Sequence, residues 1–423
     1  MSLELFDWQK KSAEELLTSL RENHVAADWS DTGTGKTPKA VWVAKKFRKD
    51  FAIICPKAVI PAWKKWCEEA SVTPAFITNY EKLRTGKTGY GDFVEGSWVW
   101  SSVIPHDFLF IWDEVHKTKG LKSLNAKLLV AAKPYNNLLL SATFASNPLD
   151  MKATGYLLGL HNHSNFWSWA LKQGVKKAPW GAFSFFGNKA KLSELHNSMA
   201  PKCSRIKISE LGDNFPDNET YAEAYDCGNV QAIYEGLAQR LRDLENSKAA
   251  DRPNPMTELL RARQEAEFLR VPVLLELSED LIKEGRSVVI FCNFRNSLDE
   301  LQYRRSNCAM IIGGQSDLER EANIAAFQSD EKTTMLCQIQ SGGVGVSLHD
   351  VLGDRPRSSL ICPTYSAIDL KQSLGRIHRA GAKSKSVQRI IFAADSIEET
   401  VMKKVKNKLK NIETLNDGDM EPV

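Results

Sequence analysis

Two segments far apart in the chain carry residue types that bind phosphate. The first is a glycine-rich loop, Ser30–Thr37, and the second is Gln372–Gly381, in which Arg376 and Arg379 stand three residues apart. Main-chain N–H groups at a helix start, a lysine and arginines are the groups with which proteins hold triphosphates. Together the two segments predict two lobes that close on one nucleotide.

The glycine-rich loop follows a short apolar run and precedes a helical pattern, the context that a phosphate-binding loop requires. Gly33 and Gly35 have no Cβ, so their backbone can approach phosphate oxygens closely. We expect Lys36 to reach the β and γ phosphates and the hydroxyl of Thr37 to bind Mg²⁺. Ser30 stands where the strict pattern has glycine.

An acidic pair, Asp113 and Glu114, directly follows the apolar run Phe108–Trp112. A buried parallel strand there would place both carboxylates at the edge of the sheet where ligands bind. We expect Asp113 to hold Mg²⁺ and Glu114 to orient and polarise the attacking water. The glycine-rich loop lies about 75 residues upstream, a usual separation for such ATPases. For His116 two roles stay open: coupling to the other lobe, or capping a turn.

Arg376 and Arg379 could neutralise the charge that develops when a γ-phosphate is hydrolysed. Such an arginine accelerates hydrolysis by about 10³–10⁵-fold. Arginine pairs on helices more often form surface ion pairs. The neighbouring Gln372, His378 and glycines favour the catalytic interpretation, and Gln372 joins the candidate catalytic residues.

Apolar runs alternate with helical patterns in both halves of the chain, which predicts an α/β fold of parallel sheets with covered faces. One helix is expected over Asp317–Phe327, with Leu318, Ile324 and Phe327 facing inward. The predicted strands are Phe51–Cys55, Phe108–Trp112, Leu138–Leu140, Val288–Cys292, Met335–Cys337, Leu360–Cys362 and Val387–Phe392.

The alternation is interrupted over residues 156–270, which we expect to be helical insertions and a linker. The remaining parts, 1–155 and 271–423, are the two expected lobes. Residues 166–186 are rich in Trp and Phe. These rings could form a wedge or a base-stacking platform, but clustered Trp and Phe are more often buried, so we expect them to be core.

Bulk composition places the chain among ordinary globular proteins. The net charge of +4 does not by itself indicate a nucleic-acid partner. No run of about 18 apolar residues occurs, so no membrane span is expected. The eight cysteines form no Cys-x-x-Cys pair, so no structural zinc is expected and the thiols are expected to be reduced. We expect a monomer in the cytoplasm, or in the nucleus of a eukaryotic cell.

Taken together, the motifs resemble those of superfamily 2 helicases and translocases, and within them the Swi/Snf-type DNA-dependent ATPases. The resemblance covers nearly the whole chain and implies two RecA-like parallel-sheet lobes with helical insertions between them. The segments that carry it are Phe6–Gln9, Ser30–Thr37 (motif I), Cys55–Lys57 and Ile77–Tyr80 (Ia and Ib), Asp113–His116 (II), Ser141–Thr143 (III), Phe291–Asn293 (IV), Ser341–Ser347 (V) and Gln372–Gly381 (VI).

The resemblance also implies ATP and Mg²⁺ as cofactors, and DNA as a partner held by its backbone with little sequence specificity. Gln9 would contact the adenine base. The implied catalytic residues are Lys36, Asp113, Glu114, Gln372, Arg376 and Arg379. The implied nucleotide-binding residues are Gln9, Thr32, Gly33, Thr34, Gly35, Lys36, Thr37 and Gly345, with Thr37 and Asp113 on the metal. The implied nucleic-acid-binding residues are Lys57, Thr78, Tyr80, Asn293, Ser341 and Gly342.

These implications predict an ATP-dependent translocase or helicase that acts on double-stranded or branched DNA. Motif III departs from the usual Swi/Snf form, because Ser141-Ala-Thr143 is the form of many unwinding helicases. Two alternatives therefore stay open. One is an RNA-dependent helicase of the DExH type. The other is an ATP-controlled nucleic-acid clamp that recruits a partner through its aromatic segment and does not translocate.

Overall fold

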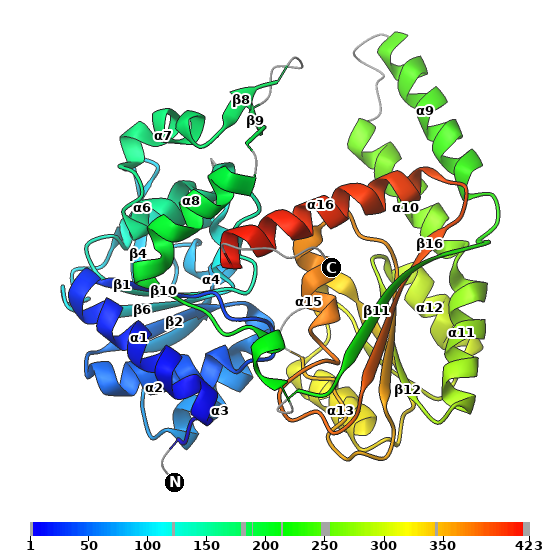
Figure 1. Ribbon diagram of the computed structural model, residues 1–423, viewed down its shortest axis with the longest axis horizontal. Helices are drawn as coiled ribbons and strands as arrows, with labels where there is room; N and C mark the ends of the chain where they lie inside the picture. Colours follow the sequence, from blue (N-terminus) through cyan, green and yellow to red (C-terminus); the bar gives the residue numbers. More distant parts are fainter. Residues whose placement is uncertain are drawn as a thin grey trace. The chain divides into compact units, whose positions relative to one another are not determined.

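The computed structural model describes residues 3–120, 123–178, 183–187, 189–212, 215–246, 254–342 and 346–417. The chain divides into two compact units, which Figure 1 shows in sequence colours. Unit 1 comprises Met1–Leu211 with Lys408–Val423, and unit 2 comprises Gly212–Asn407. None of the described helices is both long enough and apolar enough to cross a membrane.

Unit 1 is built on a six-stranded parallel sheet in the order β10-β1-β7-β6-β2-β3. Every residue of β1, β2 and β7 is buried, as expected for strands covered on both faces. The strands are β1 (Val25–Asp28), β2 (Phe51–Cys55), β3 (Phe76–Asn79), β6 (Leu109–Asp113), β7 (Asn136–Leu140) and β10 (Cys203–Ser204).

The parallel direction of these strands brings the candidate residues of unit 1 to one edge of its sheet. The glycine-rich loop follows β1, Asp113 ends β6, and Ser141 follows β7. The helices of this unit are α1 (Asp7–Asn23), α2 (Lys36–Phe47), α3 (Ile60–Glu69), α4 (Tyr80–Leu83), α5 (Leu124–Ala131), α6 (Lys152–Leu158), α7 (Phe166–Lys172) and α8 (Lys189–Met199).

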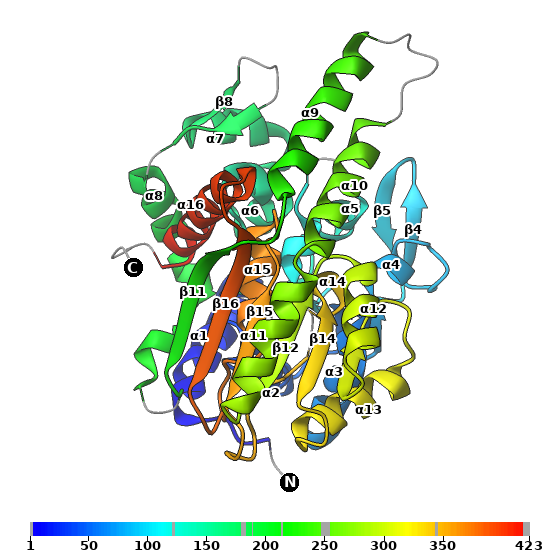
Figure 2. The ribbon, with the colours of Figure 1, turned by 90° about the vertical axis from the view of Figure 1, so that its right-hand side faces the viewer.

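Unit 2 contains a second six-stranded parallel sheet, in the order β11-β16-β15-β12-β14-β13 (Figure 2). Its strands are β11 (Asn218–Tyr225), β12 (Ser287–Cys292), β13 (Cys308–Ile311), β14 (Thr334–Gln338), β15 (Arg357–Ile361) and β16 (Ser386–Ala393). Its helices are α9 (Val230–Asn246), α10 (Pro255–Phe268), α11 (Val271–Lys283), α12 (Arg295–Arg304), α13 (Asp317–Gln328), α14 (Ile339–Gly342) and α15 (Ala367–Leu374), and α16 (Ile397–Asp417) runs across the boundary between the units in sequence.

The predicted α/β fold with two parallel-sheet lobes is confirmed by these two sheets. The predicted inward stripe of α13 is wrong at one position, because Leu318 is 81% exposed whereas Phe327 is buried. Leu318 lies in the first turn of the helix. A residue there has no preceding turn to pack beside, so helical spacing alone does not bury it.

The boundary between the units lies inside the segment 156–270. That segment contains four strands in addition to its helices. β10 completes the sheet of unit 1 and β11 completes the sheet of unit 2. Neither strand has an apolar run: β10 spans only two residues, and β11 is an edge strand in which no residue is fully buried. Hydrophobic periodicity therefore does not reveal them.

Candidate nucleotide-binding site

The glycine-rich loop has the backbone of a phosphate cradle. Gly33 and Gly35 have φ angles of 91° and 80°, in the left-handed region that glycine tolerates best. Gly35 is also the N-cap of α2, so the loop opens directly onto a helix start. A Cβ added to Gly35 would lie 2.2 Å from Nε2 of Gln9. The backbone conformation therefore favours glycine at this position, and a Cβ would displace the Gln9 amide.

Gln9, at the start of α1, is hydrogen-bonded to this loop. Its side chain is buried, with 2% of its surface exposed. Its Nε2 donates to the carbonyl oxygen of Thr34 over 2.8 Å, and its Oε1 accepts from the N–H of Phe6 over 3.1 Å. Gln9 therefore joins α1 to the phosphate loop, and its contact with an adenine base stays a prediction.

The Lys36 ammonium lies inside the loop. It donates to the carbonyl oxygens of Ser30 and Asp31, over 2.8 and 3.0 Å. Burial lowers the pKa of Lys36 to about 8, although Asp28, Glu114 and Asp31 act to raise it. The ammonium is thus poorly solvated and held by neutral carbonyls. The oxygens of a triphosphate would be stronger partners for it.

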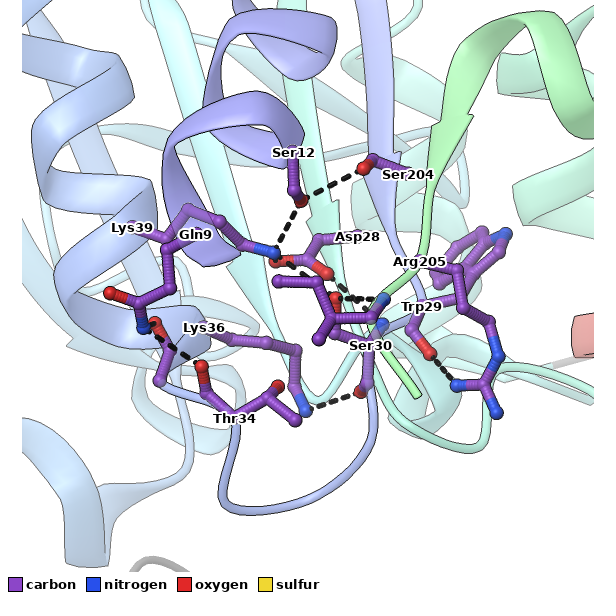
Figure 3. A network of polar contacts seen from close by, with 12 residues as sticks. Gln9, Ser12, Asp28, Trp29, Ser30, Thr34, Lys36, Lys39, Ser204 and Arg205 are labelled. Atoms are coloured by element: carbon purple, nitrogen blue, oxygen red, sulfur yellow. Dashed lines mark hydrogen bonds and ion pairs between the residues drawn. The ribbon is translucent and has the colours of Figure 1, made fainter. Parts of the chain in front are cut away.

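Ser30, the departure from the strict glycine pattern, is the centre of a buried polar network (Figure 3). Its Oγ accepts from Nζ of Lys39 over 3.1 Å and from the N–H of Ile206 over 3.0 Å. The Lys39 ammonium also forms an ion pair of 2.9 Å with Asp28, and both side chains are fully buried. The serine hydroxyl therefore connects the phosphate loop with α2 and with the segment after β10.

The segment after β10 also binds the loop at Asp31. The Asp31 carboxylate accepts from Nη2 of Arg205 over 3.2 Å and from the N–H of Ile208 over 3.1 Å. Its own N–H donates to the carbonyl oxygen of Ile206 over 3.0 Å. Figure 3 shows the Arg205 guanidinium beside the Trp29 carbonyl, to which it also donates. Lys39 and Arg205 are thus site-supporting residues absent from the sequence-based set. The role of Arg205 depends on β10, a strand that periodicity did not reveal.

The acidic pair faces the same loop. The main chain turns sharply at Glu114, whose φ is 51°. Asp113 Oδ1 accepts from the Glu114 N–H, and its Oδ2 accepts from Nε1 of Trp63, each over 2.9 Å. Burial, reinforced by the charge of Glu114, raises the pKa of Asp113 to about 7, and Lys36 acts in the opposite direction. Motifs I and II are therefore close enough to be electrostatically coupled.

Two aromatic residues hold this acidic pair in place. Trp63, on the buried face of α3, donates from its indole N–H to the Asp113 carboxylate. Tyr80 donates from its hydroxyl to the Asp113 carbonyl oxygen over 2.9 Å. The Tyr80 side chain is also fully buried. It therefore orients motif II and offers no surface to a nucleic acid.

His116 connects motif II with motif III. Its Nδ1 lies 3.2 Å from Oε2 of Glu114 and 3.2 Å from Oγ of Ser141. The Ser141 hydroxyl also accepts from the N–H of Thr143 over 3.1 Å. This chain of contacts runs inside unit 1. His116 therefore couples two motifs of one unit, and the two roles suggested for it by the sequence stay predictions.

Thr37 and Asp113 are suited to hold Mg²⁺ when a nucleotide is bound. Thr37 lies in the first turn of α2 and Asp113 ends β6, and Lys36, next to Thr37, interacts with Asp113. Mg²⁺ prefers oxygen ligands and commonly keeps waters and substrate phosphates, so two side chains suffice. A bound cation would also lower the pKa of Asp113 again.

In unit 2, the predicted arginines meet at motif V. Arg376 and Arg379 both donate to the carbonyl oxygen of Val346, over 3.3 and 3.1 Å, and Arg379 also donates to Oγ of Ser347. Arg376 and Gln372 are buried. Motifs V and VI are thus tied together. That both guanidinium groups bind a γ-phosphate stays a prediction.

The predicted nucleic-acid contacts differ in their accessibility. Lys57 is exposed, whereas Thr78 is buried. The Asn293 amide donates to Oε2 of Glu267 over 2.6 Å and to the Pro363 carbonyl oxygen over 2.9 Å. Ser341 and Gly342 end α14, but the Ser341 side chain and the whole of Gly345 lie outside the described residues. Lys57 is therefore the most accessible of the described candidates.

Comparisons with known proteins agree with this geometry. The model of the helicase conserved C-terminal domain matches residues 270–381. A protein of Acanthamoeba polyphaga mimivirus, provisionally named an ATP-dependent RNA helicase, is 32% identical over 99% of this chain and 85% of its own length. A Bos taurus protein named SWI/SNF-related matrix-associated actin-dependent regulator of chromatin subfamily A-like protein 1 is 23% identical over 90% of this chain and 42% of its own length.

Similarity to solved structures is weaker. The SWI2/SNF2 ATPase core of Sulfolobus solfataricus, solved in complex with double-stranded DNA, matches with a TM-score of 0.40 and 16% identity over 98% of this chain and 94% of that chain. The mimivirus relative covers nearly the whole sequence at a level that shows common family membership. The chain belongs to the Swi/Snf-type family of superfamily 2 helicases and is a nucleic-acid-dependent ATPase.

Proposed function

We propose that the protein hydrolyses ATP, with Mg²⁺, to move along double-stranded or branched DNA. The observation that carries the nucleotide chemistry is the placement of Lys36, Asp113 and Glu114 at one edge of the unit 1 sheet, where they interact electrostatically. DNA is favoured because several relatives are named as chromatin or DNA-repair factors, among them the Schizosaccharomyces pombe chromatin remodeling factor mit1, 27% identical over 52% of this chain and 18% of its own length.

In this proposal ATP replaces the internal partners of the loop. Lys36 leaves the carbonyls of Ser30 and Asp31 and binds the β and γ phosphates. Thr37 and Asp113 hold the magnesium ion, which neutralises phosphate charge when bound. Glu114 then orients the attacking water and polarises it, with its carboxylate steadied by His116.

The remaining charge comes from unit 2. Arg376 and Arg379 supply guanidinium groups to the γ-phosphate once the units close on the nucleotide, and closure is reversed when phosphate leaves. Each unit grips nucleic-acid phosphates, so alternate closing and opening moves the protein along the strand. Phosphate contacts carry no sequence information, so binding is expected to be salt-sensitive and nearly independent of sequence.

RNA is the second candidate substrate. It is favoured by the mimivirus relative, whose provisional name is that of an ATP-dependent RNA helicase. The Ser141-Ala-Thr143 form of motif III points the same way, because unwinding helicases share it. The ATPase core proposed above is the same for both substrates.

The deciding experiment compares steady-state ATP hydrolysis without nucleic acid and with duplex DNA, forked DNA, single-stranded DNA and RNA. We expect the greatest stimulation by duplex or forked DNA. Greater stimulation by RNA would select the second candidate, and equal rates with and without any nucleic acid would contradict a motor. A Glu114→Gln preparation measures contaminating ATPase. Displacement of a third strand from a DNA triplex then tests for movement.

A further inference from the structure

A small module of unit 1 carries aromatic rings on two sides, and only one side is used for packing. The module comprises α7, β8 (Val175–Lys177) and β9 (Phe183–Phe185). Figures 1 and 2 show it beyond α6 and α8, away from the unit 1 sheet. Its own small core contains Phe166, Ala170 and Val175, with Leu149 and Phe185 packed against them.

Leu149 connects this module with the segment that follows motif III in sequence. It belongs to η3 (Pro148–Met151), which follows motif III closely in sequence. The Asp150 carboxylate accepts from both the N–H and the hydroxyl of Ser146, over 2.9 and 2.7 Å. The start of η3 is therefore fixed, and the module rests on a rigid element next to motif III.

The second side of the module is an exposed aromatic surface. Trp167 and Phe183 are 39% and 41% exposed, and their ring centroids lie 4.5 Å apart. Phe186 is 53% exposed, and Leu171, one helical turn after Trp167, is 51% exposed. The expectation that the aromatic stretch is core thus holds for Phe166 and fails for these rings. Trp180 lies outside the described residues.

The segment that carries these rings is rich in positive charge. Residues 151–193 contain six lysines and no Asp or Glu, whereas the whole chain has 52 acidic residues in 423. About five acidic residues would be expected in a stretch of this length at the average frequency of the chain. Lys172, Lys176 and Lys177 are exposed. The surface is therefore complementary to an anion.

The strand register places one of these lysines beside the exposed rings. β8 and β9 are antiparallel, and Lys177 pairs directly with Phe183. Side chains of directly paired residues lie on the same face of the ribbon, with their Cβ atoms about 5 Å apart. An ammonium group, Phe183 and Trp167 therefore occupy neighbouring positions.

We propose that Trp167, Phe183 and Lys177 form a binding site for unpaired bases of DNA or RNA. Unpaired bases expose flat faces that stack on aromatic rings, and the attached phosphates are attracted to lysine. Bases inside a duplex are already stacked and cannot use such a site. The proposal rests on the proposed function and deepens it, because it gives the motor a contact for single-stranded arms or junctions.

The test measures binding of fluorescent oligo(dT), oligo(U) and blunt duplex DNA to the full chain by anisotropy. We expect Trp167→Ala and Phe183→Ala each to weaken binding of the unpaired oligomers about tenfold. Duplex binding should change by less than about twofold, because a duplex offers no free base faces. Lys177→Gln should weaken oligomer binding and reduce its salt dependence, as expected for one lost phosphate contact.

The matched control is Tyr303→Ala, which removes an 87% exposed ring from α12 and should leave all three affinities unchanged. Thermal unfolding establishes that each variant is folded, and the three site substitutions lie on three separate elements, α7, β8 and β9. A loss with oligo(dT), oligo(U) or both supports the site. Unchanged binding of both oligomers overturns the proposal and is the result expected for a surface that docks a protein. A loss of duplex affinity equal to the loss of oligomer affinity also overturns it. A failed motor is recognised separately, because the unmodified protein would then show no stimulated ATPase.

Discussion

At the residue scale, the acidic pair explains how one site can hold a metal and activate water. Asp113 and Glu114 are adjacent in sequence but have different surroundings. Asp113 accepts hydrogen bonds from Trp63 and from the main chain, whereas Glu114 faces His116. The turn at Glu114, where φ is 51°, separates the two carboxylates. In the proposed mechanism, Asp113 would bind the metal and Glu114 would orient the water.

Glu114→Gln should keep ATP binding and lose turnover. The amide has the size of the carboxylate but cannot accept a proton from water, and loss of such a base lowers rates by about 10²–10⁴-fold. Steady-state ATPase and binding of a fluorescent ATP analogue separate the two effects. Glu95→Gln, on the exposed turn between β4 (Gly91–Val94) and β5 (Ser97–Trp100), serves as control. Retained turnover in Glu114→Gln would remove this residue from the catalytic set.

Asp113 should make stability in the absence of Mg²⁺ and nucleotide depend on pH. Its pKa is raised from 3.8 to about 7, so the folded state binds this proton more tightly than the unfolded chain. The group therefore favours folding at low pH, and this contribution is lost as pH rises towards 7. Asp113→Asn removes the buried charge and should raise the melting temperature more at pH about 8 than at pH about 5.

The matched substitution for this measurement is Asp354→Asn in an exposed loop of unit 2. It should shift the melting temperature equally little at both pH values. Added Mg²⁺ with nucleotide should stabilise the unmodified protein and not Asp113→Asn. If Asp113→Asn shifted the melting temperature equally at both pH values, the result would contradict a raised pKa of Asp113 in the folded state.

At the element scale, the phosphate loop is held by a segment more than 160 residues away in sequence. Ser30 accepts from Ile206 across a sequence separation of 176 residues, and Asp31 accepts from Ile208 across 177. This segment leads directly to the boundary of unit 1 at Leu211. The loop is thus hydrogen-bonded to a segment of unit 1 that lies only a few residues before Leu211.

Ser30→Gly should destabilise unit 1 although it restores the strict loop pattern. The change removes the hydroxyl acceptor of the buried Lys39 ammonium and of the Ile206 N–H. Lys39 keeps Ser12 and Asp28 as partners, whereas the Ile206 N–H loses its acceptor. Leaving a buried donor without an acceptor costs about 1–3 kcal/mol. Urea unfolding measures the loss, and Ser102→Gly in an exposed loop gives the cost of a glycine alone. Equal midpoints for the two variants would show that the Ser30 hydroxyl is not needed.

At the scale of the whole molecule, the proposed motor depends on groups from both units. Lys36 and Glu114 belong to unit 1, whereas Arg376 and Arg379 belong to unit 2. A residue that acts only after closure should affect turnover and leave nucleotide binding to unit 1 intact. This separation distinguishes the arginines from the residues of the loop.

Arg379→Lys tests the contribution of unit 2. Lysine keeps the charge but lacks the planar fork that binds phosphate. Nucleic-acid-stimulated turnover should fall about 10³-fold or more, with ATP affinity changed by less than about threefold. Arg304→Lys, an exposed residue of α12 paired with Glu300, is the control. Loss of ATP binding together with turnover, or turnover equal to the control, would contradict a role limited to the closed state.

By itself, the sequence determined the features that local chemistry encodes. The glycines of the phosphate loop, the acidic pair after an apolar strand and the alternation of strands with helices each carry a short-range signal. Six parallel strands in each unit and the loop beside Asp113 agree with those signals. These features could be predicted from the sequence without knowledge of the fold, because backbone conformation, strand burial and residue type are properties of a few neighbouring positions.

Only the tertiary structure decided which distant residues support the site and which rings are exposed. Arg205 reaches the nucleotide site through a two-residue strand that leaves no periodic signal. Helical spacing predicts that Trp63 faces inward, but not that it donates to Asp113. The same limit applies to the burial of Tyr80, whose hydroxyl donates to Asp113, and to the exposure of Trp167, whose neighbour Phe166 is part of the core. Burial depends on the area that the surrounding elements can cover, and that quantity exists only once the chain is folded.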